Sequence, residues 1–253
     1  LTRSSVSIRD EKGVPATREV RVTAQSGAVM GKGKYRHFML KEIYEQPSAV
    51  ADTLNTYINP ATGHITFDDK ILALAASPRI TVSACGTAFY AGLVAKYWLE
   101  QIARIPVEAD VASEFRYREA PMPEGGAALF ISQSGETLDT LEALRYCRRQ
   151  GQTIVSVLNT IESTIERESN HVIRTLAGPE IGVASTKAFT TQLTTLACLT
   201  LALACKNGNL SPEAERRLTA ALRELPARMS ALLNHDEKIQ SMAKEVAEAR
   251  DVS

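Results

Sequence analysis

Short apolar segments alternate with helical segments between residues 79 and 205, and this alternation restricts the possible fold more than any other feature. Each short run of apolar, mostly β-branched residues is followed by a stretch with helical spacing. Parallel strands joined in this way form a sheet with helices on both faces, because the crossover connections are right-handed. The sequence therefore predicts an α/β fold, a three-layer sandwich around a doubly wound, five-stranded parallel sheet.

The boundaries of these elements follow from the turn and capping residues between them. Ser211 is a favourable N-cap and Pro212 a favourable first residue for one further amphipathic helix, over 211–233. The other helices are predicted at 87–103, 137–150, 163–170 and 185–205, and the strands at 79–86, 105–113, 127–132, 153–159 and 171–176.

The first 34 residues have a different character. Residues 4–24 alternate apolar and polar side chains around the turn sequence "EKGVPA", which predicts a short β-hairpin, and the glycine-rich residues 25–34 read as a linker. Helical spacing over residues 35–56 is interrupted at Pro47, and its candidate core positions are Phe38, Leu40, Ile43, Tyr44, Val50 and Leu54. The predicted parts are a tail of a preceding domain plus linker (1–34), a helical entry segment (35–74), the sheet domain (75–210) and a helical extension (211–253).

Composition excludes several classes of function. The 29 basic and 29 acidic side chains balance, which argues against a nucleic-acid binder. The four histidines and four cysteines lack metal-ligand spacing, so no metal or cofactor is expected. The apolar run 193–205 is shorter than the ~20 residues that span a bilayer, and residues 1–10 lack a secretory core, so we expect a cytoplasmic protein and no membrane partner.

Three predicted strands lead towards helices through stretches rich in small residues and hydroxyl groups. These stretches are "SACGTAFYAG" (83–92), "ISQSGETLDT" (131–140) and "PEIGVASTKAFTTQ" (179–192). Ligands of open parallel sheets bind at the carboxyl ends of the strands, where these stretches would meet. Helix N-termini offer unpaired N–H groups to an anion, and the serine, threonine and glutamine side chains would add donors. The alternative is that the hydroxyl groups only cap their own helices.

The same stretches, together with "YRHFMLKEIYEQP" (35–47) and "ASEFRYRE" (112–119), resemble the synthase part of the glutamine–fructose-6-phosphate aminotransferases. The resemblance covers nearly the whole chain from about residue 35, and it implies a sugar isomerase domain for the sheet. It also implies that residues 1–34 end a glutaminase domain, and that the sequence is a fragment of a homodimeric enzyme that binds fructose 6-phosphate or glucosamine 6-phosphate.

The resemblance also implies roles for individual residues. The phosphate of the sugar would be held by Thr87, Ser132, Gln133, Ser134 and Thr137, and the sugar would lie beside Val183 and Ser185. Many relatives have serine where this chain has Ala88, which removes one hydroxyl group but leaves the backbone N–H.

The family's catalytic groups are not found in this sequence. The resemblance places them on an N-terminal cysteine, on a glutamate and a histidine of a second sugar isomerase domain, and on a lysine of a C-terminal tail. Lys187 is not that lysine, and we interpret it as a surface or interdomain lysine. The charged residues Glu114, Arg116 and Arg118 line the site, pair across a dimer interface, or belong to a solvated loop; the sequence leaves these alternatives open.

Three functional hypotheses follow. The first is the phosphosugar-binding part of the aminotransferase, which makes glucosamine 6-phosphate from fructose 6-phosphate and glutamine; this part would bind its ligand without turnover. The second is a stand-alone phosphosugar-binding regulatory module, although no helix-turn-helix pattern supports a DNA-binding regulator. The third is a free-standing phosphosugar isomerase, for which no acid/base pair is visible near the site.

Overall fold

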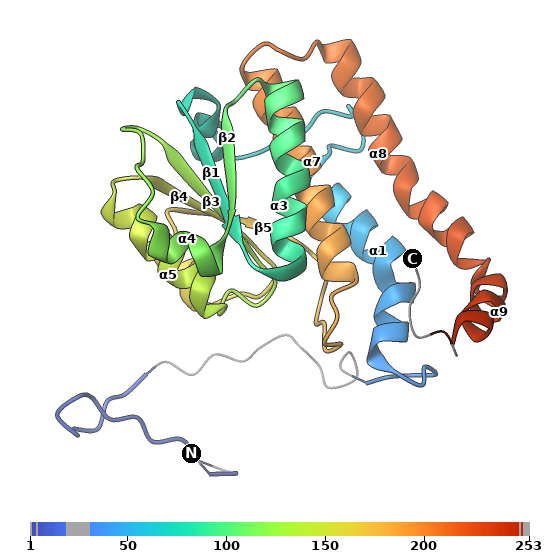
Figure 1. The fold of residues 1–253 in the computed structure, drawn as a ribbon, viewed down its shortest axis with the longest axis horizontal. Helices are drawn as coiled ribbons and strands as arrows, with labels where there is room; N and C mark the ends of the chain where they lie inside the picture. Colours follow the sequence, from blue (N-terminus) through green and yellow to red (C-terminus); the bar gives the residue numbers. More distant parts are fainter. Residues whose placement is uncertain (1, 4, 19–30, 248, 250–253) are drawn as a thin grey trace. The chain divides into compact units, whose positions relative to one another are not determined.

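The computed structural model describes residues 2–3, 5–18, 31–247 and 249 (Figure 1). The chain divides into two compact units, Leu1–Gly31 and Lys32–Ser253. In the first unit, Arg9 and Pro15 form an antiparallel bridge, and the Asp10 carboxylate accepts the N–H of Val14 at 2.9 Å. These residues form the turn of the predicted hairpin. Most of its second strand and of the predicted linker lies outside the described residues.

The second unit is built on a sheet of five parallel strands, in the order β2-β1-β3-β4-β5. Every residue of β1 and β3 is buried, including Thr81 and Ser83 of β1, as expected for central strands of a sheet that is covered on both faces. The predicted parallel α/β fold is therefore confirmed. The strands are β1 (Ile80–Ala84), β2 (Val107–Val111), β3 (Ala127–Ser132), β4 (Thr153–Leu158) and β5 (His171–Arg174).

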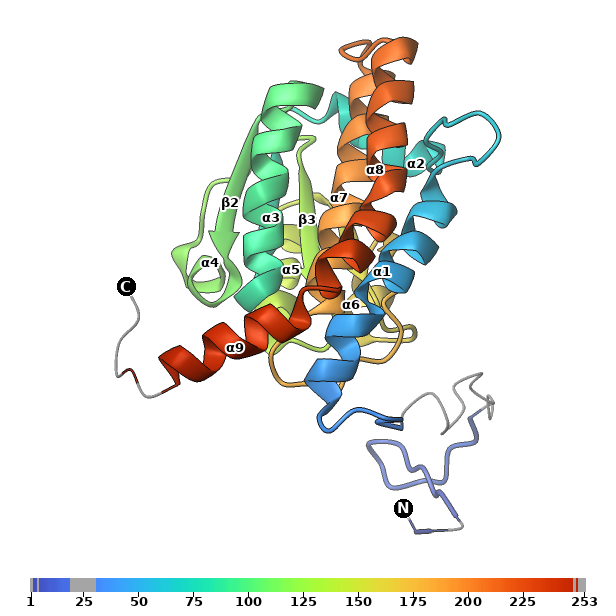
Figure 2. The same cartoon turned by 90° about the vertical axis from the view of Figure 1, so that its right-hand side faces the viewer.

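Helices cover both faces of the sheet (Figures 1 and 2). On one face lie α1 (Phe38–Tyr57), α3 (Gly86–Trp98), the π-helical turn Leu99–Ala103 that continues α3, and α7 (Lys187–Lys206). The other face carries α4 (Ala112–Arg118), α5 (Leu138–Arg149) and α6 (Thr164–Glu168). Outside this sandwich, α8 (Pro212–Leu233) packs on α1 and α7, and α9 (Asp236–Val246) follows it; the short helices α2 (Asp69–Leu72) and Ala73–Ala76 precede β1.

Helix α1 continues through Pro47, so the predicted interruption is wrong. Proline cannot donate to the carbonyl of Ile43 four residues earlier. The side-chain amide of Gln46 donates to that carbonyl at 3.1 Å and replaces the missing hydrogen bond. Of the candidate core positions, Val50 and Leu54 are buried, whereas Phe38, Leu40, Ile43 and Tyr44 are only partly buried because they lie in the first two turns.

Residues 112–118 form helix α4, although the sequence suggested the end of a strand followed by a charged loop. Ala112 and Phe115 are three residues apart, on the same face of this helix, and both are buried against the sheet. Burial of this pair favours the helix over a longer β2 strand. The charged side chains of α4 are left on its outer side.

Helix α7 contains the apolar run 193–205, which by itself is too short to span a membrane. With 20 residues, it is the one helix in the described part of the chain that is long and apolar enough to cross a membrane. However, it packs against α1 and α3, and 72% of its apolar window is buried inside the protein. We therefore identify α7 as a core helix.

The topology brings two strand ends together. The chain passes from β1 outward to β2 and then returns to the other side of β1 for β3, so β1 and β3 are neighbours at the point where the strand order reverses. Their register pairs Ala84 with Ile131, which aligns the residues that follow each strand. Clefts at such switch points are the usual ligand sites of open parallel sheets.

Candidate functional site

A pocket of about 470 Å³ lies at the carboxyl ends of β1 and β3. The structure brings all seven residues predicted from the sequence to this pocket, because the turns after β1 and β3 and the loop before α7 converge there. The lining residues include Thr87, Ser132, Gln133, Ser134, Thr137, Val183 and Ser185.

The turn after β3 is held by hydrogen bonds within the turn and by one hydrogen bond from α6. The Ser132 hydroxyl accepts the N–H of Gly135 at 3.0 Å, and the Ser134 hydroxyl accepts the N–H of Glu136 at 3.2 Å. Behind the turn, the Gly135 carbonyl accepts the N–H of Ile165 at 3.0 Å. These bonds hold the hydroxyl groups of the turn at the pocket surface.

The N-cap residues of α3 and α5 do not cap their helices. Cys85 and Thr137 occupy the N-cap positions, and neither makes a capping hydrogen bond. Capping hydroxyl groups do occur elsewhere in the chain, since Ser163 caps α6 and Ser211 caps α8, as the sequence predicted for Ser211. The capping alternative is therefore wrong for α3 and α5, whose N-cap residues both line the pocket.

The N-terminus of α7 differs because it already holds a carboxylate. Glu180 accepts the N–H groups of Thr186 and Ala188 at 2.9 and 3.1 Å, and the hydroxyl group of Ser185 at 3.0 Å. A second anion at this terminus would meet the charge of Glu180. The pocket thus has a polar, anion-accepting end at α3 and α5 and an end at α7 that carries a negative charge.

The loop before α7 forms the other wall of the pocket. Val183 is fully exposed on this loop, and Ser185 is turned towards Glu180. Ala88 lies in the pocket wall in the first turn of α3, where its methyl group takes the place of the hydroxyl group that the resemblance led us to expect. Among the described residues that line the pocket there is no lysine or arginine.

Sequence reasoning missed three residues around the pocket. Glu180 and Gln192 line it, and Glu42 of α1 accepts the N–H groups of Ile181 and Gly182. Gln192 is 2% exposed, and its Oε1 atom has no hydrogen-bond partner in the described structure. Glu42 and Gln192 could have been identified from the sequence, because each is a polar residue on the apolar face of its helix. Glu180 lies in a loop and carries no such signal.

The charged residues that the sequence left open do not line the pocket. Arg116 pairs with Asp139 at 2.7 Å, Arg118 pairs with Glu108 and Asp110, and Glu114 is exposed on α4. Because residues 112–118 form a helix, the interpretation as a solvated loop is wrong, and pairing across a dimer interface stays a prediction.

Lys187 was interpreted as a surface or interdomain lysine, and the surface alternative is wrong. It is 4% exposed, and its Nζ atom donates to Glu45 of α1 at 2.7 Å. It begins α7 but is absent from the residues that line the pocket. Its observed role is to join α7 to α1.

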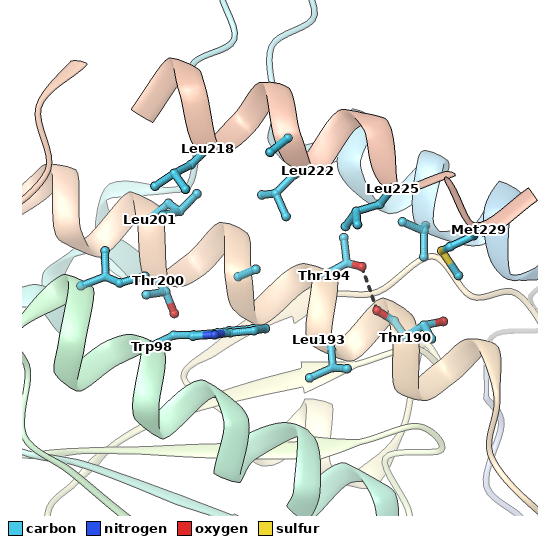
Figure 3. A pocket seen from close by; sticks show the side chains of 14 residues that line it. Trp98, Thr190, Leu193, Thr194, Thr200, Leu201, Leu218, Leu222, Leu225 and Met229 are labelled. Carbon is cyan, nitrogen blue, oxygen red and sulfur yellow. Dashed lines mark hydrogen bonds between the residues drawn. The ribbon is translucent and has the colours of Figure 1, made fainter. Parts of the chain in front are cut away.

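A second cavity, of about 450 Å³, lies between α8 and the helices α1, α3 and α7 (Figure 3). Leu218, Leu222 and Leu225 of α8 face Trp98 and the apolar side of α7 across it. Its threonine hydroxyl groups bond to their own helix; for example, Thr194 donates to the carbonyl of Thr190 at 2.8 Å. Because the threonine hydroxyl groups are already bonded and the other described lining residues, apart from the Trp98 indole, are apolar, we do not assign a polar ligand to this cavity.

Comparisons with known proteins identify the same region of the chain. Residues 73–202 match the SIS domain family. The chain is 52% identical over 253 residues to the glutamine–fructose-6-phosphate aminotransferase (isomerizing) of Bradyrhizobium diazoefficiens, and 48% identical over 252 residues to that of Zymomonas mobilis. In each case all of this chain is covered, but only 42% of the relative's length, so the chain spans less than half of the curated relatives it matches.

A solved structure supports the assignment of the fold. The C-terminal domain of glucosamine-fructose-6-phosphate aminotransferase from Francisella tularensis superposes with a TM-score of 0.80 at 39% sequence identity, covering 86% of this chain and 61% of that chain. The family match extends from just before β1 into α7 and so includes every strand of the sheet and all three pocket turns. The chain therefore belongs to the SIS domain family.

Proposed function

We propose that this chain is the phosphosugar-binding part of a glutamine–fructose-6-phosphate aminotransferase, an enzyme that makes glucosamine 6-phosphate from fructose 6-phosphate and glutamine. The observation that carries the proposal is the pair of uncapped helix N-termini, α3 and α5, beside the hydroxyl groups of the turn after β3. A sugar phosphate is a small anion with several acceptor oxygens, and this arrangement supplies donors without a cationic side chain.

In the proposed complex, the phosphate lies between the N-termini of α3 and α5 and accepts hydrogen bonds from Thr87, Ser132, Gln133, Ser134 and Thr137. The sugar extends towards the loop of Val183 and Ser185. This orientation is supported by the charge at the other end of the pocket, because Glu180 already neutralises the N-terminus of α7 and would repel a phosphate there.

In this proposal, the chain binds fructose 6-phosphate but does not convert it to product. Isomerisation of a ketose needs a general base within hydrogen-bond reach of the sugar. Glu180 is the one carboxylate among the described residues lining the pocket, and its oxygens already accept bonds from the start of α7. We expect proton NMR to show no conversion of fructose 6-phosphate; conversion by the purified chain would contradict this part of the proposal.

The binding site is tested by calorimetry with fructose 6-phosphate and with fructose. We expect fructose 6-phosphate to bind and fructose to bind far more weakly. Ser134→Ala removes one donor to a charged group, about 1.5 kcal/mol, and should weaken fructose 6-phosphate binding roughly tenfold. Ser230→Ala, at an exposed serine of α8, is the control and should leave the affinity unchanged.

Equal affinity for the two sugars, or an unaffected Ser134→Ala variant, would refute the phosphate site.

We further propose, from the resemblance alone, a cytoplasmic and homodimeric protein. Sedimentation equilibrium on the protein that contains this chain tests the dimer.

A further inference from the structure

The loop before α7 is fastened to α1 by a carboxylate that is about 140 residues away in the sequence. Glu42 Oε1 accepts the N–H of Ile181 at 2.6 Å and that of Gly182 at 3.1 Å, and its Oε2 also lies 3.1 Å from the Gly182 nitrogen. The next residue along the loop is Val183, in the wall of the pocket. The backbone of the loop is therefore held by a side chain that does not itself line the pocket.

Among the residues that the structure describes, Glu42 is one of three buried charged side chains, with an exposed fraction of 2%. Burying a carboxylate is unfavourable unless its oxygens are hydrogen-bonded, and apolar residues would pack at this position of α1 without that cost. Both oxygens of Glu42 face the loop, and both are bonded to backbone N–H groups. The side chain therefore fixes the loop at a defined place relative to α1.

Gly182 fits this contact closely. A Cβ atom at this position would lie 2.5 Å from Glu42 Oε2 and 3.4 Å from the Cα atom of Met39, so a larger residue would push the loop away from α1. A few residues further along the chain, Lys187 donates to Glu45, one helical turn from Glu42. Helix α1 thus holds the loop near its start through Glu42 and at the beginning of α7 through Lys187.

We propose that Glu42 is a positioning residue that sets the loop of Val183 and Ser185 against the sugar, and that it plays no part in holding the phosphate. This inference rests on the proposed function, in which the loop contacts the sugar and the turns of α3 and α5 contact the phosphate. It predicts that removing the Glu42 carboxylate weakens the contacts with the sugar and leaves the contacts with the phosphate unchanged.

The test compares two ligands by calorimetry on the whole chain: fructose 6-phosphate, and glycerol 3-phosphate, which carries the phosphate without the hexose. Glu42→Ala leaves two backbone N–H groups without their acceptor and frees the loop. We expect about tenfold weaker binding of fructose 6-phosphate and less than about twofold change for glycerol 3-phosphate.

Two further variants distinguish positioning from general destabilisation. Glu42→Gln keeps one oxygen that can accept both N–H groups, and should restore most of the affinity for fructose 6-phosphate. Asp52→Asn makes the same charge change at an exposed position of α1 and should alter neither affinity. Gly182→Ala breaks the contact from the loop side, and we expect the same selective loss, with no additional loss in the Glu42→Ala/Gly182→Ala double variant.

The inference is overturned if Glu42→Ala keeps full affinity for fructose 6-phosphate, or if it weakens both ligands equally. If Glu42→Ala does not fold, the selective loss in Gly182→Ala decides the question, and its absence overturns the inference. A wild-type chain that binds neither ligand overturns the proposed function as well. If Ser134→Ala weakens the binding but the Glu42 and Gly182 variants do not, only the present inference fails.

Discussion

The turn after β3 depends on a single glycine at its centre. Gly135 has a φ of +68°, which residues with a side chain rarely adopt, and a Cβ atom there would lie 2.1 Å from the hydroxyl oxygen of Ser163. The steric constraint arises because Ser163, at the start of α6, packs behind the turn. The same packing keeps Ser132 and Ser134 at the pocket surface.

We therefore predict that Gly135→Ala lowers the free energy of unfolding by about 2–4 kcal/mol and abolishes measurable fructose 6-phosphate binding, since both strain and a steric overlap are introduced. Gly208→Ala is a matched control. Gly208 has a similar φ of +70° but no atom within 4 Å of the added Cβ, so only the smaller cost of the backbone conformation applies. Urea unfolding and calorimetry measure the two effects. Equal destabilisation by both variants would contradict the steric explanation.

The four cysteines differ in their surroundings, and this gives a test that needs no variant. Burial raises the pKa of Cys147 and of Cys198 to about 12, and burial together with Glu215 raises that of Cys205 to about 11. Cys85 is partly exposed and lines the pocket. We predict that Cys85 is the thiol that reacts fastest with a small disulfide reagent, because the reactive form is the thiolate.

Saturating fructose 6-phosphate should slow the labelling of Cys85 at least severalfold while leaving the other thiols unchanged. Peptide mapping by mass spectrometry identifies the labelled residue, and fructose serves as the control ligand. Fast labelling of Cys85 that the phosphosugar does not slow would contradict the proposed position of the ligand.

At the scale of elements, α6 supports the pocket turn and is itself held by ion pairs. The Glu136 carboxylate accepts the N–H of Thr164 at 2.7 Å, and this bond lowers the pKa of Glu136. Arg145 of α5 donates to both oxygens of Glu168, which lowers the pKa of Glu168 below its ordinary value of 4.5. Both carboxylates are therefore more acidic in the folded protein.

A group with a lowered pKa stabilises the fold above its ordinary pKa, and this contribution is lost as the pH falls through the lower, folded-state value. We predict that the urea midpoint is insensitive to these groups at neutral pH and decreases with acidification below about pH 4.5. Glu168→Gln should lower stability at pH 7 and make the acid decrease shallower. Glu237→Gln, on exposed α9, is the control and should behave like the unmodified chain. An unchanged acid profile in Glu168→Gln would argue against the ion pair.

Sequence patterns were sufficient to predict the strands but not every helix. All five strands were predicted because each is a short segment with β-branched or apolar residues between helix or turn residues, although only β1, β3 and most of β4 are buried. Helix α4 was missed because its seven residues show only one apolar pair, Ala112 and Phe115, within a charged segment. The continuation of α1 through Pro47 depends on one side-chain bond from Gln46, which the residue pattern does not reveal.

At the scale of the whole molecule, a buried carboxylate joins α8 to the segment between α1 and α2, and apolar packing joins α8 to the core. Glu215 accepts the N–H of Ile65 at 3.0 Å and lies 2.9 Å from His64 Nδ1. Leu222 and Leu225 contact the core that α1, α3 and α7 share (Figure 3). None of these residues lines the polar pocket.

We predict that Glu215→Ala lowers the free energy of unfolding by about 1–3 kcal/mol, because it leaves the Ile65 N–H without its acceptor, and that fructose 6-phosphate affinity is retained. Glu213→Ala, at an exposed position in the same helical turn, is the matched control. Chemical unfolding and calorimetry separate the two outcomes. A loss of affinity without a loss of stability would show that α8 acts on the pocket.

The sequence by itself determined the parallel sheet and the three turns that meet at its edge, because strand burial, helix periodicity and turn residues are local properties. The seven residues of the candidate site came from the resemblance of its motifs to a known family, and five of them lie at or after the ends of the neighbouring strands β1 and β3. Only the tertiary structure decided how the three helix N-termini differ. Glu180 accepts the N–H groups at the start of α7 and Glu42 binds the loop before it, whereas the N-cap residues of α3 and α5 make no capping bond. Such contacts depend on backbone groups and side chains that meet only when the chain has folded, and for Glu42 they join residues about 140 positions apart.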